Sequence, residues 1–283
     1  MTATEPTPTS PSWWTPALRE FEAHLRAANR RPLTIHGYLR DLEQLRAWLI
    51  AQERGDELPG TSDLRHWLAE LQESGASGAT LARKRSTLAA FFGFVSEQKL
   101  IPTSPVEGLE HPTHEYELPQ TLSRAEVAAL LAITEPHPRD HAIFQVLLGC
   151  GLRVSEVCAL TRSSLDAQAL YVAGRVVPVP PGVRAALDRW LAENPDNLVF
   201  SIKQRMVRIL CEKYRELAGI PREITPSLLR HTCAVWQLVD GAEAEHIKLR
   251  FGHEREDVLV HYLHRARQLQ EVEAKNWKQA TLL

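Results

Sequence analysis

Apolar residues recur at intervals of three and four through the first third of the chain. Leu18, Phe21 and Leu25 form the first such stripe, and three more follow before residue 100. This period places the apolar side chains on one face of a helix, where they can be buried together. The segment 13–109 is therefore predicted to form four core-facing helices, the last over 79–98.

Breaks between these helices are marked by proline and glycine. They fall at Pro32, in the glycine-containing segment 55–60 and in 75–78. A short polar residue that can cap a helix N-terminus follows or ends each break: Thr34, Ser62 and Ser77.

A proline-rich segment after residue 102 has little periodicity, which predicts a linker over 110–120. Ser123 with Glu126 three residues later forms a capping box that opens the next helical region. Further helices are expected over 139–149, 182–191, 203–218, 227–239, 244–249 and 258–275. In helix 203–218 the apolar residues Ile202, Met206, Ile209, Leu210, Tyr214 and Leu217 are expected to face inward.

Only one segment has the alternation of a strand pair. Residues 169–172 and 176–179 are apolar and flank a turn at Gly174-Arg175, which predicts a short hairpin. The fold class is therefore mainly α with one small antiparallel sheet, in two domains at 13–109 and 121–283. Residues 1–12, rich in Thr, Pro and Ser, are expected to be a disordered tail.

Composition narrows the class of protein. A chain of 283 residues with 44% apolar residues can bury two modest cores. Its net charge of -2 means that a nucleic-acid partner would be met by local basic patches and not by overall charge. Four cysteines without a C-x-x-C pair indicate reduced thiols, and no apolar stretch is long enough to cross a bilayer. A cytoplasmic protein is expected.

Two basic patches stand out. The helix over 79–98 carries Thr80, Arg83 and Lys84, all able to reach phosphates, with an ordinary solvated face as the alternative. Between residues 201 and 232 the sequence has seven Lys or Arg residues and only three Glu residues. That local excess predicts a second phosphate-contacting surface, for which we single out Lys203, Arg205 and Arg208.

The residues that can carry chemistry lie mostly near the end of the chain. A tyrosine that attacks a phosphate diester needs cations on the non-bridging oxygens and a donor for the leaving oxygen. Arg153 and Arg230 suit the first role, because a guanidinium binds phosphate bidentately and keeps its charge. Taken alone, each arginine is more simply a surface ion pair and Tyr262 a half-buried helix residue.

Three segments of the sequence favour a catalytic role for these residues over an ordinary structural one. GLRVSEVCAL, TPSLLRHTCAVWQL and FGHEREDVLVHYLH resemble the three signature boxes of the tyrosine site-specific recombinases, particularly the bacterial Xer and integrase branch. The resemblance covers residues 14 to 275 and includes the end of the first domain. Single boxes are weak signals, whereas their order and the spacing from Arg230 to His253 to Tyr262 are strong ones.

The resemblance implies a role for each matching residue. Arg153 and Arg230 match the arginines that hold the scissile phosphate, His253 matches a supporting histidine, and Tyr262 matches the nucleophile that forms a 3′-phosphotyrosyl bond. It implies a two-domain clamp around double-stranded DNA, with a helical, SAM-like core-binding domain over 13–109 and a catalytic domain over 121–283. No metal or cofactor is implied. The implied partners are further copies in a synaptic tetramer or a sister recombinase, on the nucleoid.

Two positions depart from the family pattern. Ser227 occupies the place of the histidine that usually opens the second box, and His231 matches a histidine that is commonly structural. The shortened hairpin lacks the family's lysine, which acts as the general acid, and Arg175 is the only cation near its tip. Arginine gives up a proton reluctantly. A catalytically impaired, recombinase-like DNA-binding or accessory protein is therefore the alternative to an active enzyme.

Two smaller questions stay open at this stage. Glu156, one turn after Arg153, either orients that arginine or is a simple surface carboxylate. His246, His253, His261 and His264 are dense enough for a metal site, but no carboxylate or cysteine completes a ligand set at an obvious spacing. No metal site is therefore predicted.

Overall fold

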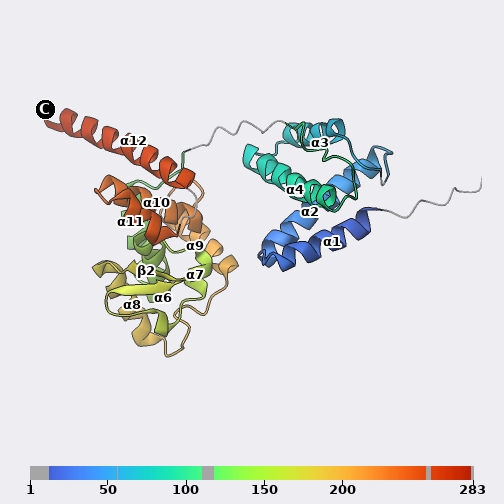
Figure 1. Cartoon of the computed structure of the whole chain (residues 1–283). Coiled ribbons are helices and arrows are strands. Elements are labelled where there is room, and N and C mark those ends of the chain that lie inside the picture. Colours follow the sequence, from blue (N-terminus) through green and yellow to red (C-terminus); the bar gives the residue numbers. More distant parts are fainter. Residues whose placement is uncertain (1–12, 56, 110–117, 253–255, 282–283) are drawn as a thin grey trace, which may run out of the picture. The chain divides into compact units, whose positions relative to one another are not determined.

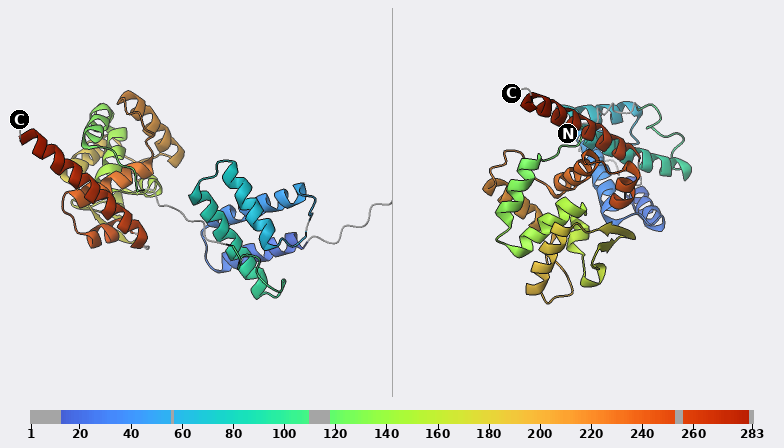
Figure 2. Two further views of the ribbon diagram at one scale, coloured as in Figure 1. Left: turned by 90° about the horizontal axis from the view of Figure 1, so that it is seen from above. Right: turned by 90° about the vertical axis from the view of Figure 1, so that its left-hand side faces the viewer.

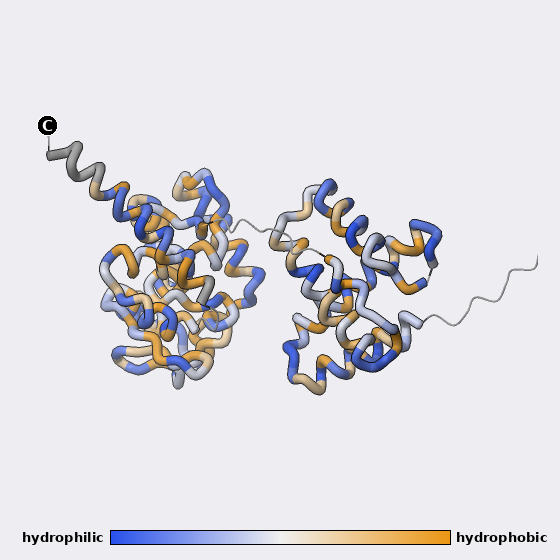
Figure 3. Tube along the Cα trace, turned by 45° about the horizontal axis from the view of Figure 1, so that its top comes forward, coloured by the Kyte–Doolittle hydropathy of each residue, from blue (hydrophilic) through white to orange (hydrophobic). Residues whose placement is uncertain are grey.

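The computed structural model describes residues 13–55, 57–109, 118–252 and 256–281, with the backbone alone for 256, 257 and 275–281. Its contacts divide the chain into two compact units, Met1–Tyr116 and Glu117–Leu283, here called the N-terminal and C-terminal units (Figure 1). The expected tail over 1–12 and most of the expected linker lie outside the described residues. In both units hydrophobic and hydrophilic residues alternate along the helices (Figure 3).

The described part of the N-terminal unit contains the four expected helices. Aromatic residues dominate its core: Trp14 stacks on Phe91 with 5.6 Å between ring centroids, and Phe21 meets Phe91 edge-on at 5.4 Å. Ile101, just before the proline-rich segment, and Leu109, within it, are also buried in this core. The four helices are α1 (Trp14–Ala27), α2 (Pro32–Ala51), α3 (Thr61–Glu73) and α4 (Gly78–Glu97).

The expected helix caps are confirmed at one of three positions. The Ser77 hydroxyl accepts a hydrogen bond from the backbone N–H of Thr80. Thr34 and Ser62 lie inside their helices, because α2 already begins at Pro32 and α3 begins after Gly60. Proline is preorganised for the first helical position, and the Asp63 carboxylate accepts from the Gly60 N–H at 2.8 Å, so both helices begin early.

Asp41 of α2 is the polar centre of the N-terminal unit. It is 2% exposed and accepts hydrogen bonds from Arg83, from the Lys84 ammonium at 3.0 Å and from the Thr87 hydroxyl at 3.1 Å. Lys84 itself is 4% exposed and lies over the Trp67 ring at 5.0 Å. The ion pair of Asp41 and Lys84 links α2 to α4 inside the N-terminal unit.

The described part of the C-terminal unit is also mainly helical, with one two-stranded sheet, so the predicted fold class is confirmed. The capping box of Ser123 and Glu126 is present at the start of its first helix. Its elements are α5 (Arg124–Thr134), α6 (Pro138–Gln145), the π-helical turn η1 (Val146–Cys150), α7 (Val154–Cys158), the 3₁₀ turn η2 (Arg162–Ser164), β1 (Ala169–Val172), β2 (Arg175–Pro178), α8 (Pro181–Glu193), α9 (Gln204–Leu217), α10 (Pro226–Val239), α11 (Ala244–Phe251) and α12 (Glu256–Thr281).

The predicted hairpin is present, but its turn is Ala173-Gly174 and not Gly174-Arg175, so the second strand begins one residue earlier than expected. Its strands are antiparallel, with Leu170 opposite Val177 and Val172 opposite Arg175. Ala173 and Gly174 both have positive φ, 49° and 73°, which is the backbone of the tight turn that matches strand twist. Arg175 therefore begins β2 directly after the turn.

Two predictions for the helices were wrong in detail. The helix expected over 139–149 ends at Gln145 and continues as the wider turn η1, which brings the chain to Gly151. Met206, Ile209 and Leu217 of α9 are exposed, not inward-facing. The buried stripe is Val207, Leu210, Cys211 and Tyr214, whose spacing of three, one and three follows a single helix face.

Helix α10 is buried on two sides. Leu228 and Leu229 belong to the main core of the C-terminal unit, whereas Cys233 and Ala234 belong to a second core formed with α11 and α12. Helix α12 packs along α10, and its last turns run beyond the rest of the unit (Figures 1 and 2). This second core is what holds Tyr262, on α12, against α10.

Replacement of Asp41 by Ala would leave the buried Lys84 ammonium without its carboxylate. Breaking a buried ion pair in this way costs about 3–5 kcal/mol. We expect the free energy of unfolding of the N-terminal unit, measured by urea titration with tryptophan fluorescence, to fall by that amount. Glu22→Ala, which removes an exposed pair with Arg26, is the control and should have little effect. An Asp41→Ala protein as stable as the parent would contradict this account.

Candidate phosphate-binding active site

Gly151 lets two segments of the C-terminal unit meet closely, the turn after η1 and the end of α11. Its φ of +63° is unfavourable for residues with a side chain, and a Cβ here would lie 2.4 Å from Cε1 of the Phe251 ring. The turn after η1 can therefore approach the end of α11 closely only because residue 151 is glycine. Two residues later this turn presents Arg153 at the N-terminus of α7.

Arg230, on α10, binds both of these segments. Its guanidinium donates to the carbonyl oxygens of Gly151, at 2.6 Å, and of Phe251, and it lies over the Phe251 ring at 4.8 Å. Burial, and next the nearby charge of Arg153, lower the pKa of Arg230 to about 10. The group is still cationic at neutral pH, so a buried positive charge faces the site.

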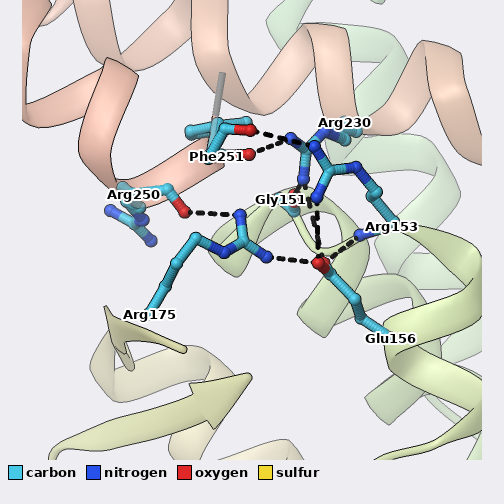
Figure 4. A network of polar contacts seen from close by, with 8 residues as sticks. Gly151, Arg153, Glu156, Arg175, Arg230, Arg250 and Phe251 are labelled. Carbon is cyan, nitrogen blue, oxygen red and sulfur yellow. Dashed lines mark hydrogen bonds and ion pairs between the residues drawn. The ribbon is translucent and has the colours of Figure 1, made fainter. Parts of the chain in front are cut away.

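Arg153 is the more accessible of the two arginines, with 44% of its side chain exposed. Nη1 donates to Oε1 of Glu156 at 3.1 Å and Nη2 donates to the Gly252 carbonyl at 3.1 Å. Oε2 of Glu156 also accepts from the Arg153 backbone N–H at 2.7 Å. Glu156 thus orients Arg153, which decides between the two interpretations of this carboxylate (Figure 4).

Arg175 reaches the same carboxylate from the hairpin. Its guanidinium donates to Oε1 of Glu156 and to the Arg250 carbonyl at 3.1 Å, and only 12% of the side chain is exposed (Figure 4). It does not line the cavity beside Arg153 and Arg230. The sequence singled out Arg175 only as the one cation near the hairpin tip. Its Nη1 and Nη2 protons are directed to a backbone oxygen and to Glu156, so it holds the arginine cluster together and does not reach the cavity as a proton donor.

A cavity of about 360 Å³ lies beside this cluster. It brings together Arg153, Arg230, Tyr262 and Ser227, all of which the sequence singled out. Ser227 is exposed in the first turn of α10. His253 lies outside the described residues. The described lining consists of Arg153, Val154, Ser155, Pro226, Ser227, Arg230, His231, Val258 and Tyr262.

Tyr262 is 1% exposed, and its hydroxyl oxygen lies 2.7 Å from Nδ1 of His231. Burial raises the pKa of Tyr262 to about 12, although the charge of Arg230 opposes the shift. Burial, and next the charge of Arg230, lower the pKa of His231, so this imidazole is neutral at pH 7. Sequence reasoning gave His231 only a structural role. The available signal was its spacing of four from Ser227, which puts both on one face of α10.

The predicted DNA-contacting residues differ in accessibility. Thr80 is half-buried, and Arg83 has half of its side chain exposed while it contacts Asp41. Lys203, Arg205 and Arg208 are exposed at the start of α9. The prediction that Lys84 contacts DNA was wrong. Its ammonium is buried and donates hydrogen bonds to Asp41 and Gln44, and the Asp41 carboxylate compensates its charge within the core.

Two further properties concern the described residues only. No cluster of three or more His, Cys, Asp or Glu among them could hold a metal ion. No helix there is both long and apolar enough to span a membrane.

A single methyl group at Gly151 tests the close approach of these segments. In Gly151→Ala the backbone strain of about 1–2 kcal/mol is joined by a clash with Phe251 worth about 1–3 kcal/mol. Gly219→Ala is a matched control, because Gly219 has φ of +66° and no atom within 4 Å of the point where a Cβ would lie. We expect thermal unfolding to show a clearly larger loss for Gly151→Ala. Equal losses would contradict the proposed packing.

Known protein families match both units of the chain. The model of the phage integrase family matches residues 120–268, and that of the phage integrase N-terminal SAM-like domain matches residues 18–99. Tyrosine recombinase XerC of Rhodospirillum centenum is 33% identical over 267 residues, covering 81% of this chain and 76% of the relative. Tyrosine recombinase XerA of Thermococcus onnurineus is 31% identical over 256 residues, covering 83% and 86%.

Solved structures show the same fold at lower identity. A lambda integrase (75–356) dimer bound to a COC′ core site matches with a TM-score of 0.72 and 18% identity, covering 88% of this chain and 94% of that one. The Tn1549 transposon integrase in complex with circular intermediate DNA matches with a TM-score of 0.71 and 20% identity, covering 89% and 98%. From the family match over the arginine and tyrosine site, and from its Xer relatives, the chain belongs to the phage integrase family of tyrosine recombinases.

Proposed function

We propose that Tyr262 is the nucleophile with which this tyrosine recombinase cleaves DNA, and that Arg153 and Arg230 bind the scissile phosphate. Members of this family break and rejoin DNA at specific sites. The observation that carries the assignment is the convergence of both guanidinium groups and the Tyr262 side chain on one cavity. They come from α7, α10 and α12, so no local pattern in the chain explains their meeting.

The chemistry follows from this arrangement. The Tyr262 oxygen forms a bond to phosphorus as the bond to the 5′ oxygen breaks, which leaves a 3′-phosphotyrosyl link and a free 5′ hydroxyl. The arginines offset the charge on the non-bridging oxygens, and they are already held in place by backbone carbonyls and Glu156. Attack by a 5′ hydroxyl on the phosphotyrosine reverses the step. No cofactor is required, because the covalent link conserves the bond energy.

Other residues complete the proposed site. His253 would support the phosphate, as the family pattern implies, and the Ser227 hydroxyl would donate a hydrogen bond to a non-bridging oxygen. None of the described residues that line the cavity is a lysine. The convergence of Arg153, Arg230 and Tyr262 on one cavity supports an active enzyme over the alternative of an impaired accessory protein.

We further propose how the protein meets its partners. Double-stranded DNA would contact Thr80 and Arg83 of the core-binding domain, 13–109, and Lys203, Arg205 and Arg208 of the catalytic domain, 121–283. The segment 110–120 would act as the linker between them. A related integrase structure is a tetramer bound to a Holliday junction. By analogy, copies of this chain, alone or with a sister recombinase, would assemble on DNA in the cytoplasm, next to the nucleoid.

Covalent attachment to DNA tests the catalytic assignment. Incubation with a nicked suicide duplex that carries the recombination site should give an adduct that survives SDS. Tyr262→Phe should give none, because the nucleophilic oxygen is missing. Tyr171→Phe is the control: Tyr171 is half-exposed on β1, its hydroxyl bonds Asp166, and its replacement should leave the yield unchanged. An undiminished adduct in Tyr262→Phe would refute the assignment.

Salt dependence tests the proposed α9 contacts. Each lost phosphate contact should reduce the slope of log K against log salt concentration by about 0.9 for duplex DNA. We expect the double variant Arg205→Ala/Arg208→Ala to lower the slope by about 2 in an electrophoretic or fluorescence titration. Arg189→Ala, on α8 and paired with Glu135, should leave it unchanged. An unaltered slope in the double variant would place the DNA surface elsewhere.

A further inference from the structure

The contact between His231 and Tyr262 is not explained by the phosphate-binding role of their neighbours. Building on the proposed function, we propose that His231 is the general base that takes the proton from the Tyr262 hydroxyl during DNA cleavage and returns it during rejoining. In the family pattern a histidine occupies position 227, which is serine in this chain. His231 lies one helical turn later on α10.

The geometry suits direct proton transfer. The Tyr262 oxygen and Nδ1 of His231 are 2.7 Å apart, within hydrogen-bond reach. In the neutral tautomer with the proton on Nε2, Nδ1 accepts the hydroxyl hydrogen. His231 also lines the same cavity as Arg153 and Arg230, so its acceptor lies next to the place where phosphorus would sit.

The surroundings keep His231 in the form that can accept a proton. Among the described residues that line this cavity, the other charged or titratable groups are Arg230 on the same helix, Arg153 at the start of α7 and Tyr262 on α12. Burial and the charge of Arg230 lower its pKa below the ordinary value of 6.5. Ser227, on the same face of α10, has only a hydroxyl, which cannot serve as a base near neutral pH.

Tyr262 needs such a base. With its pKa raised to about 12, only about one molecule in 10⁵ carries the phenolate at pH 7. A bound phosphate would add negative charge and make spontaneous ionisation harder still. Removing the proton as the bond to phosphorus forms avoids that unfavourable intermediate.

Protons and bonds balance in this step. The hydroxyl proton moves from Tyr262 to Nδ1 of His231, the phenol oxygen forms its bond to phosphorus, and the bond to the 5′ oxygen breaks. Water supplies the proton that the departing 5′ oxygen takes up. In rejoining, the 5′ hydroxyl gives its proton to hydroxide as it attacks phosphorus, and the imidazolium returns its proton to the phenol oxygen of Tyr262.

His231→Asn separates a base from a mere hydrogen-bond partner. The asparagine oxygen can still accept from Tyr262 but cannot hold its proton. We expect single-turnover adduct formation on the suicide duplex to slow by about 10²- to 10⁴-fold. DNA affinity and the thermal unfolding midpoint should stay close to the parent values. His246→Asn, an exposed histidine on α11, should cleave at the parent rate.

The pH profile distinguishes the base from a structural role. The parent rate should fall with acid through an apparent pKa below 6.5 and be flat between about pH 7 and 8.5, since neutral His231 is the active form. The rate of His231→Asn should instead rise about tenfold per pH unit, because hydroxide must remove the proton. A parent rate that itself rises through this whole range would overturn the proposal, even if the variant does not fold.

A substrate with sulfur in place of the 5′ bridging oxygen gives a second readout. Sulfur leaves without a proton, so this duplex rescues the loss of an acid and not the loss of a base. His231→Asn should stay slow on it. Rescue would assign His231 to the leaving group, and a variant as fast as the parent would remove it from the chemistry. Absence of any adduct in the parent protein would instead count against the proposed function.

Discussion

The hydrogen bonds of the buried Arg230 guanidinium are the interactions on which the geometry of the candidate site depends. It holds the carbonyl oxygens of Gly151 and Phe251 from α10, and so joins the turn before α7 to the end of α11. Arg153 follows the first of these segments, and Gly252, whose carbonyl Arg153 contacts, follows the second. The guanidinium proposed to bind phosphate thus also fixes the shape of the cavity that it lines.

A second constraint is the double burial of α10. One side of this helix belongs to the main core of the C-terminal unit, and the other belongs to the small core with α11 and α12. Packing of α12 on that second side buries Tyr262 and sets its hydroxyl against His231. Tyr262 and His231 are therefore already in contact beside Arg153 and Arg230 in the structure without DNA, and such preorganisation limits the rearrangement needed for catalysis.

The sequence predicted the local elements well, because their signals are local. The Ser123–Glu126 capping box and the four helices of the N-terminal unit appear as expected, and the hairpin is present with its turn one residue earlier than predicted. What failed depends on distant partners. Lys84 was assigned to DNA because nothing near it in the chain reveals Asp41, 43 positions earlier, and His231 meets Tyr262 across 31 positions. The arginine and tyrosine positions were found through a family pattern, which carries such long-range information. The contact of Arg175 with Glu156 spans 19 positions, and the shortened hairpin gave no sign of it.

The most direct test of this account is to map the protein–DNA linkage itself. After cleavage of a suicide duplex and digestion with nuclease and protease, mass spectrometry should find a nucleotide attached through its 3′ phosphate to the phenol oxygen of Tyr262. Attachment at another residue, or a 5′-linked nucleotide, would contradict the proposed arrangement of nucleophile and phosphate ligands.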